Sequence, residues 1–309
     1  MAVDLHSKLG SISLKSPILT ASGTAASGKE LDQFFDITQI GGIVTKSIML
    51  NPRSGRATPR MVETPSGMLN SIGLQGPGVD QFIENDLRWL AERGATTIVS
   101  IAGNDAREFW QVAQKLRGHP AIAGFEVNIS CPNVANRGLV FACHPASAAE
   151  VVAEVRSAVG ADFPLFAKLS PDVTSISEIA YSVVDAGANG VSLINTLLGM
   201  ALDHRTLKPI LGGRTGGLSG PAIRPVAIRA VYQVRAALPD VPIIGMGGIR
   251  SGIDALEFLA AGANAISVGT AIFSDPSAPM RIQRELESEI AARNFRSVAE
   301  VVSIAHLGV

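Results

Sequence analysis

The stretch 257-EFLAAGANAISVG-269 combines the end of an amphipathic helix, a glycine and a short apolar run. The same rhythm recurs in 89-WLAERGATTIVSI-101 and 182-SVVDAGANGVSLI-194. A glycine just past a helix end can take the left-handed conformation that stops the helix, so Gly94, Gly187 and Gly262 are expected caps. The apolar runs hardly alternate, which is typical of strands covered on both faces in a parallel sheet. The repeat therefore predicts helix–strand units of an α/β fold.

Apolar runs of this kind occur along the whole chain. They are 17-PILTASG-23, 41-GGIVTKS-47, 96-TTIVSIAG-103, 125-FEVNIS-130, 164-PLFAKLS-170, 189-NGVSLIN-195, 241-VPIIGMGG-248 and 264-NAISVGT-270. Helix-like segments, among them 146–159, 222–238 and 251–262, separate most of them. Strands alternating with helices in this number predict a (β/α)8 TIM barrel, as one domain over residues 1–309, with a doubly wound sheet as the alternative. The connections 47–79, after the second strand, and 196–220, after the sixth, are long, which favours functional loops.

Composition narrows the class of protein. Apolar residues make up 47% of the 309 residues, charged residues 17%, and the formal net charge is −1. Without a basic run, the sequence favours neither nucleic-acid binding nor a membrane surface. The N-terminus lacks the pattern of a signal peptide, and two cysteines fit a reducing compartment, so a cytoplasmic enzyme is expected. The scattered histidines show no metal-ligand spacing, and no metal site is predicted.

Polar residues stand where the predicted strands end. Because the carboxyl ends of barrel strands meet at one mouth, these side chains should converge there. In chain order, the residues at the strand ends are Ser22, Lys46, Ser100, Asn128 with Cys131, Lys168, Asn195 with Thr196, Gly247 with Gly248, and Gly269 with Thr270. The last two pairs, with Gly220 in 216-GGLSGPAIRP-225, indicate a phosphate site, since glycine lets backbone N–H groups approach an anion.

Each residue also has a plain structural interpretation. A lone cysteine is more often a buried hydrophobe than a catalytic group, and Cys143 is interpreted in that way. Cys131 follows a strand end and stands between Asn128 and Asn133, which favours a catalytic role. Lys168 lies in an apolar stretch, where its ammonium needs an anionic or hydrogen-bonding partner. A bound anion or an electron-rich ring would serve.

Several motifs together resemble the dihydroorotate dehydrogenase family over nearly the whole chain. They are 45-TKS-47, 70-NSIGLQ-75, 128-NISCPN-133, 195-NTLLGMALD-203, 216-GGLSGPAIRP-225, 243-IIGMGGI-249 and 267-SVGTA-271. The cysteine and the NSIGLQ form are similar to class 1, and within it to subclass 1B, which works with an electron-transfer subunit. The resemblance implies a barrel that binds FMN and oxidises (S)-dihydroorotate to orotate in pyrimidine biosynthesis.

The resemblance also implies roles for individual residues. Cys131 would be the base that removes the C5 proton while hydride leaves C6 for the flavin. The implied substrate-binding residues are Lys46, Asn70, Ser71, Ile72, Gly73, Leu74, Asn128, Asn133, Asn195 and Thr196. The implied FMN contacts are Ser22, Lys46, Ser47, Ser100, Asn128, Lys168, Ile194, Gly220, Gly247, Gly248, Gly269 and Thr270. Two positions depart from the family pattern: Ser100, where relatives often have asparagine, and Gly76, where LQNPG is commoner than LQGPG.

The electron acceptor and the partners are further expectations. Two cysteines are too few for the four ligands of an ordinary iron–sulfur cluster, and no G-x-G-x-x-G follows a strand to bind NAD. The subclass resemblance implies NAD as final acceptor, reached through a partner subunit that carries FAD and an iron–sulfur cluster. It also implies a homodimer core within a heterotetramer. The sequence leaves open whether NAD, fumarate or another acceptor is physiological.

Rival functions remain at this point. A dihydropyrimidine dehydrogenase-like flavoenzyme would act on uracil-like rings and need no partner for a carboxylate. A barrel aldolase would use Lys168 to form a Schiff base. A phosphate-binding barrel without catalysis is the third alternative.

Overall fold

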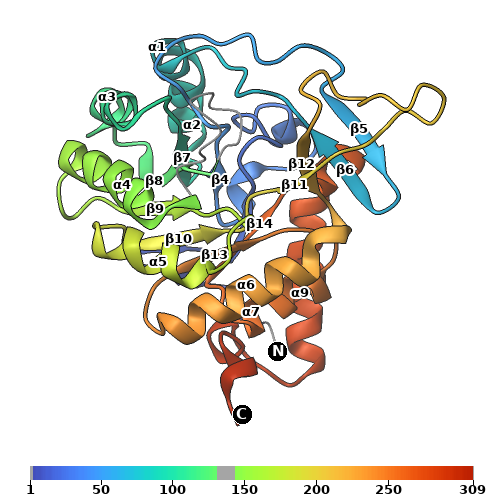
Figure 1. Cartoon of the computed structure of the whole chain (residues 1–309). Helices are drawn as coiled ribbons and strands as arrows, with labels where there is room; N and C mark the ends of the chain where they lie inside the picture. Colours follow the sequence, from blue (N-terminus) through green and yellow to red (C-terminus); the bar gives the residue numbers. More distant parts are fainter. Residues whose placement is uncertain (1–2, 131–142, 309) are drawn as a thin grey trace.

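Parallel strands form the centre of the computed structural model, which describes residues 3–130 and 143–308 (Figure 1). The eight strands follow the order β3-β14-β13-β10-β9-β8-β7-β4, and a parallel bridge between Leu19 and Gly42 closes the sheet into a barrel. The strands are β3 (Ile18–Thr20), β4 (Ile43–Val44), β7 (Thr97–Ile101), β8 (Ile122–Val127), β9 (Leu165–Lys168), β10 (Gly190–Leu193), β13 (Ile243–Met246) and β14 (Ala265–Val268). The predicted (β/α)8 barrel is confirmed.

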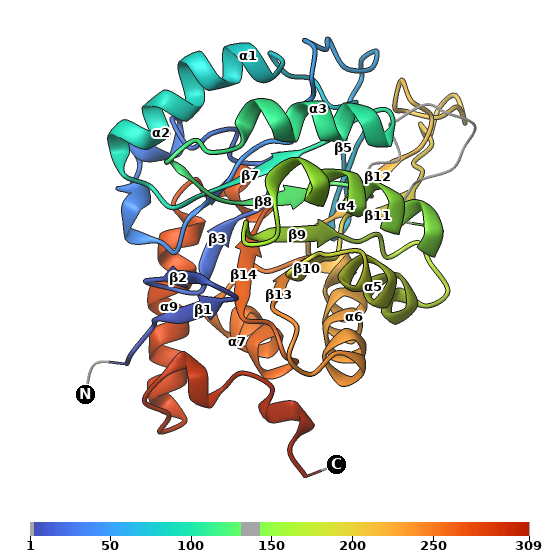
Figure 2. The same cartoon turned by 90° about the vertical axis from the view of Figure 1, so that its left-hand side faces the viewer.

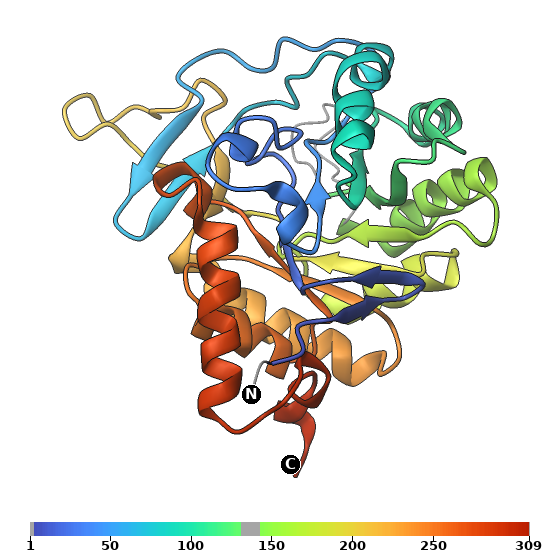
Figure 3. The same ribbon diagram turned by 180° about the vertical axis from the view of Figure 1, so that it is seen from behind.

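Helices surround the barrel, as the view from behind also shows (Figure 3). The α-helices are α1 (Val79–Gln81), α2 (Arg88–Arg93), α3 (Ala106–Leu116), α4 (Pro145–Val159), α5 (Ile176–Asp185), α6 (Arg224–Ala237), α7 (Gly252–Ala260), α8 (Ala271–Ser274) and α9 (Ala278–Ala292). The other helical segments are η1 (Leu31–Gln33), η2 (Ile37–Gln39), η3 (Phe82–Leu87), η5 (Pro221–Ile223), η6 (Val298–Glu300) and η7 (Ile304–His306). The three helices predicted at 146–159, 222–238 and 251–262 correspond to α4, α6 and α7. Only the short turns η1 and η2 stand between β3 and β4.

The three repeated glycines end their helices in the same way. Gly94, Gly187 and Gly262 have φ of 69°, 106° and 119°. The Gly187 N–H donates to a carbonyl three residues back, and the next N–H, of Ala188, donates to Val183 O at 2.9 Å. The same pair of bonds occurs after Gly94 and Gly262, and it is the pattern of a Schellman cap. The repeat in the sequence is therefore a repeated turn from helix to strand.

A hairpin near the N-terminus packs into one end of the barrel. It consists of β1 (Ser7–Leu9) and β2 (Ile12–Leu14), and Figure 2 shows it beside β3 and β14. Leu9 and Leu14 are fully buried in an apolar cluster with inward-facing residues of the barrel strands. A larger apolar cluster lies between the strands and the helices. The amino-terminal end of the barrel is thus filled with apolar side chains, which leaves the opposite end for a site.

The two long connections pair with each other. The first contains β5 (Met61–Thr64) and β6 (Gly67–Asn70), and the second contains β11 (Leu197–Gly199) and β12 (Gly216–Ser219). All four join in an antiparallel sheet of order β11-β12-β6-β5, in which Gly217 stands opposite Asn70. This sheet lies away from both termini (Figures 1 and 2). The long loops after strands 2 and 6 are confirmed, and the part of the chain described here has no helix long and apolar enough to cross a membrane.

Candidate active site

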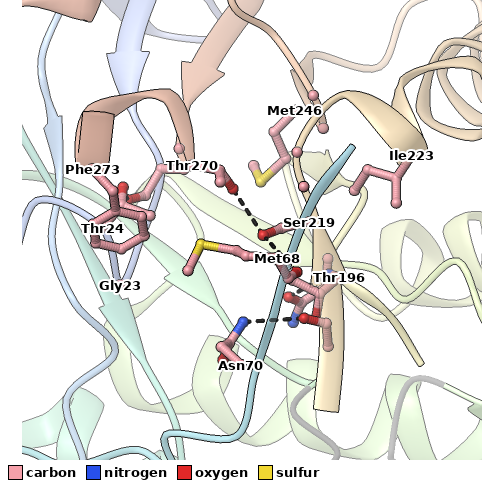
Figure 4. A pocket seen from close by; sticks show the side chains of 18 of the residues that line it. Gly23, Thr24, Met68, Asn70, Thr196, Ser219, Ile223, Met246, Thr270 and Phe273 are labelled. Atoms are coloured by element: carbon pink, nitrogen blue, oxygen red, sulfur yellow. Dashed lines mark hydrogen bonds between the residues drawn. The ribbon is translucent and has the colours of Figure 1, made fainter. Parts of the chain in front are cut away.

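A pocket of about 730 Å³ lies at the carboxyl ends of the barrel strands. Hairpin β5–β6 and strand β12 form its outer wall, where Met68 pairs with Ser219 on the neighbouring strand, and Figure 4 shows Asn70 and Thr196 beside this pair. This volume is within the range of cofactor and small-molecule sites. The predicted residues that line it are Ser22, Lys46, Ser47, Asn70, Ile72, Gly73, Leu74, Asn128, Lys168, Ile194, Asn195, Thr196, Gly220, Gly247, Gly248, Gly269 and Thr270.

Two predicted site residues that the structure describes, Ser71 and Ser100, are not in this lining. Ser71 is buried behind the loop, where its hydroxyl accepts a hydrogen bond from Arg56 Nη1 at 3.3 Å. Ser100 is buried within β7, with its Oγ 2.9 Å from Ser47 Oγ. Cys131 and Asn133 lie outside the described residues. Ser71 and Ser100 therefore support residues that line the pocket.

The buried partner of Lys168 is a carboxylate that the sequence analysis missed. Lys168 Nζ lies 3.3 Å from Glu126 Oε1 and donates to Ser22 Oγ at 2.8 Å. Hydroxyls of Ser100 and Ser192 donate to the two oxygens of Glu126, each at 3.0 Å. Glu126 lies on β8 and precedes Asn128, which directly follows that strand, by two residues, so both side chains point to the same side. A charged residue within a buried strand, on the face that carries Asn128, was the signal that could have identified it.

Amide groups at the ends of β8 and β10 are connected to each other. Asn128 Nδ2 donates to Ser47 Oγ at 2.9 Å, and Ser130 Oγ donates to Asn128 Oδ1 at 3.1 Å. Asn195 Nδ2 donates to Ser130 Oγ at 2.7 Å, while its Oδ1 accepts from the Thr196 N–H at 2.8 Å. These bonds fix both amides, which suits recognition of a ring with several donors and acceptors.

Glycines with unusual backbone angles form another part of the wall. Gly220, Gly247 and Gly248 have φ of 92°, 134° and 76°, a region that other residues rarely adopt. A Cβ on Gly248 would stand 2.7 Å from Gly220 O, and a Cβ on Gly220 would stand 2.7 Å from Gly67 Cα, so neither position has room for a side chain. Arg250 also lines the pocket, next to these glycines in sequence. A glycine wall, which lets a ligand approach the backbone closely, and a guanidinium together suit an anionic group such as a phosphate.

The buried hydroxyl of Ser267 indicates that a ligand binds in this pocket. Its side chain lies in β14, is 1% exposed and lines the pocket. Among the described residues, its Oγ has no hydrogen-bond partner. A buried hydroxyl without a partner is costly, so a polar ligand atom would satisfy it. Neighbouring Thr270 instead donates to Ser219 Oγ at 2.8 Å, as the dashed line in Figure 4 shows.

Sequence reasoning missed most of the outer wall. The additional lining residues there include Met61, Pro65, Ser66, Gly67, Met68, Gly217 and Ser219, and Phe273 lies at another edge. A signal existed in 61-MVETPSGMLN-70, where two short runs flank a Pro-Ser-Gly turn, as in a hairpin. The described residues contain no cluster of His, Cys, Asp or Glu that could hold a metal ion.

Comparisons with known proteins bear on this site. A family model described as "Dihydroorotate dehydrogenase" matches residues 4–290. A protein of Geotalea uraniireducens is 49% identical over 299 residues, which cover 97% of this chain and 97% of that protein. A protein of Desulforamulus reducens is 48% identical over 307 residues, 99% of this chain and 100% of that protein. Both are named "Dihydroorotate dehydrogenase B (NAD(+)), catalytic subunit".

Proposed function

Because this chain belongs to the dihydroorotate dehydrogenase family, we propose that it oxidises (S)-dihydroorotate to orotate in de novo pyrimidine biosynthesis. The observation that carries the proposal is the pocket in which Lys46, Asn70, Asn128 and Asn195 line one cavity. Dihydroorotate is a ring of amide-like groups with one carboxylate. A site for it needs amides, which donate and accept, and a cation, and this pocket contains both.

The enzyme is a flavin enzyme by family, and the proposed flavin is FMN. The pocket fits this group, because Ser267 presents a buried hydroxyl without a partner among the described residues, and Gly220, Gly247 and Gly248 line the wall together with Arg250. Gly220, Gly247, Gly269 and Thr270 would hold the phosphate end, and Ser22, Ser47, Lys168 and Ile194 the ring. FMN, when bound, would accept hydride from C6 of the substrate.

Substrate-binding roles follow from the contacts of each side chain. Asn128 and Asn195 are fixed through Ser130 and would orient the substrate ring, with Thr196 beside them. Lys46 would bind the carboxylate. The loop with Asn70, Ile72, Gly73 and Leu74 would cover the other face. Ser71 and Ser100 would act by holding this loop and Ser47, and the proposed contact by Asn133 lies outside the described residues.

Cys131 is the proposed base, and it follows Ser130 directly in sequence. It lies outside the described residues, so the proposal rests on the family motif and on the fixed position of Ser130. The thiolate would take the C5 proton onto Sγ as hydride leaves C6, so that both hydrogens depart from adjacent carbons. A thiol with a pKa near ~8.5 is mostly protonated at neutral pH, and the base form therefore grows with pH.

The test is anaerobic reduction of the purified chain, loaded with FMN, by dihydroorotate. Wild-type protein should lose its yellow absorbance rapidly, and Cys131→Ala should lose most of that rate. Cys143→Ala is the matched control, because Cys143 is the chain's other cysteine and bonds to the Asp172 carbonyl instead of lining the pocket. It should bleach like wild type.

Other outcomes separate the rival functions. Yellow protein that dihydroorotate does not bleach would move the substrate toward uracil-like rings. A colourless protein that takes up no FMN would contradict the flavin proposal, and borohydride trapping with a sugar phosphate would then test the aldolase. The ion pair of Lys168 with Glu126 already weighs against the aldolase, since a Schiff-base lysine must react as a neutral amine.

The relatives are named as catalytic subunits, which implies a partner subunit in those enzymes. We infer a partner that carries FAD and an iron–sulfur cluster and passes electrons to NAD, around a homodimer core of this chain, in the cytoplasm. The chain alone should then reduce NAD slowly with dihydroorotate, and adding the partner should raise the rate. Efficient NAD reduction by the chain alone would contradict the partner's role, and fumarate is the acceptor to try next.

A further inference from the structure

The buried carboxylate of Glu126 has no role in the reaction described above. It lies beneath the pocket floor, with its side chain 0% exposed, and Lys168, whose side chain is 4% exposed, separates it from the cavity. We propose that Glu126 is a positioning residue: it fixes the Lys168 ammonium at the pocket floor and balances its charge. The inference rests on the proposed function, because it assigns Lys168 to the flavin.

The first support is the rigidity of the arrangement. Glu126 and Ser100 stand opposite each other on β8 and β7, and Ser192 and Lys168 do so on β10 and β9. The carboxylate therefore receives donors from three neighbouring strands, at 3.0, 3.0 and 3.3 Å. With both oxygens held, it has no freedom to turn away from Lys168. The position of the ammonium is set by the barrel and not by the ligand.

The second support is the number of donors on the lysine. An ammonium has three N–H groups. Among the described residues, Lys168 Nζ has two hydrogen-bond acceptors, Glu126 Oε1 and Ser22 Oγ. Lys168 and Ser22 line the pocket and Glu126 does not. The third N–H is thus available to a ligand atom on the pocket side, and Glu126 influences that ligand only through the lysine.

The third support is electrostatic. An uncompensated ammonium at this depth would attract the negative charge that a flavin gains on reduction, and would bind the reduced form much more tightly than the oxidised form. Glu126 makes the pair neutral, so the floor presents a directed N–H donor with little net charge. A flavin on such a floor can still pass its electrons onward, because its reduced form is not held too strongly.

The experiment compares Glu126→Gln, Lys168→Met and the double variant with wild type. The measured quantity is the ratio of the FMN dissociation constants for oxidised FMN and for FMN reduced with dithionite. Glu126→Gln leaves a net positive floor and should favour the reduced form about tenfold or more. Lys168→Met leaves a net negative floor and should shift the ratio the other way. The double variant should return to within about threefold of wild type.

Thermal stability provides a second readout. Each single variant leaves a buried charge without its partner and should melt below the double variant. A Glu126→Gln protein that fails to fold, beside a double variant that folds, would therefore support the pairing. A carboxylate that only holds Ser100 and Ser192 would give equal losses in both Lys168 backgrounds, and that result would overturn the inference. An unchanged FMN ratio in Glu126→Gln would overturn it as well.

Failure of the proposed function is distinguishable from failure of this inference. Neither readout uses dihydroorotate. Wild-type protein that binds FMN but is not bleached by dihydroorotate would therefore contradict the proposed substrate and leave the inference about Glu126 testable. Wild-type protein that binds no FMN would overturn the flavin site and the role of Glu126 toward it together. In that case melting of the double variant would still show whether the two side chains are coupled.

Discussion

Substitution of Gly248 by alanine should weaken FMN binding in addition to lowering the stability of the fold. Gly248 has φ of 76°, and a Cβ there would stand 2.7 Å from Gly220 O and 2.9 Å from Arg224 Cβ. Ordinary van der Waals contact begins at 3.4 Å, so Gly220 and Gly248 must separate by about 0.7 Å, the difference between 3.4 and 2.7 Å. Both residues line the pocket where we place the phosphate.

The magnitude follows from this displacement. A backbone N–H bound to a phosphate oxygen at about 2.9 Å would move to about 3.6 Å, which is beyond hydrogen-bond distance. A lost hydrogen bond to a charged group costs about 1.5–3 kcal/mol, which corresponds to a factor of about ten or more in the dissociation constant. The left-handed backbone adds a further cost of about 1–2 kcal/mol to folding.

Gly94→Ala is the matched control for the backbone cost. Gly94 has nearly the same φ, 69°, but a Cβ there meets nothing within 4 Å, and it lies outside the pocket lining. Titration of flavin fluorescence with each apoprotein should give wild-type affinity for Gly94→Ala and at least about tenfold weaker binding for Gly248→Ala. Both should melt at least about 2 °C lower. Gly248→Ala with an FMN affinity within twofold of wild type would refute the placement of the phosphate.

Three further predictions concern the thiols and the barrel frame. Bleaching of the flavin by dihydroorotate should accelerate as pH rises through about 8.5, the usual thiol pKa, if Cys131 is the base; a rate flat with pH would exclude it. Burial raises the pKa of Cys143, so its thiolate is scarcer than that of a free cysteine at the same pH. In a Cys131→Ala background, mass spectrometry should show iodoacetamide labelling Cys143 more slowly than free cysteine at pH 7.5. Arg235→Met should lower the free energy of unfolding in urea by about 1–3 kcal/mol, because it leaves the Gly262 carbonyl without its two donors, at 3.0 and 2.7 Å. Arg229→Met, an exposed change on the same helix, should stay within about 0.5 kcal/mol of wild type, and equal losses in the two variants would contradict the role of Arg235.

Local sequence patterns were sufficient to predict the barrel. Each helix–strand turn is encoded within a few residues, since Gly94, Gly187 and Gly262 end their helices and an apolar run follows at once. The number of such units then leaves few alternatives to a closed barrel. The local patterns did not predict that β6 pairs with β12, because Asn70 and Gly217 belong to two connections that are far apart in the chain.

Site residues at strand ends could be predicted from the sequence. Interaction partners that are distant in the sequence could not. Lys168 stands at a strand end, so barrel geometry alone places it at the mouth. Its partner Glu126 belongs to another strand, and only the register of β8 with β9 brings the two together. Ser71 and Ser100 show the opposite error: the family resemblance implied contacts with substrate and FMN for them, but their hydroxyls bond to Arg56 and Ser47 and do not line the pocket.

The side chains on the inward face of the barrel change from apolar to mostly polar between one layer and the next. Its apolar plug includes Leu19, Val44, Ile98, Phe166, Ile244 and Ala265. Two residues further along the chain, and therefore on the same face, stand Lys46, Ser100, Lys168 and Ser267, while Ala21 and Met246 remain apolar. This alternation was hidden in the sequence on three strands, because the outward residues between them, Val99, Ala167 and Ile266, are also apolar and belong to the cluster under the helices. The consequence is electrostatic as well as structural. The charged pair of Lys168 and Glu126 lies directly above side chains that exclude water, so its field is screened from the pocket side alone, and a ligand that fills the pocket removes that screening too.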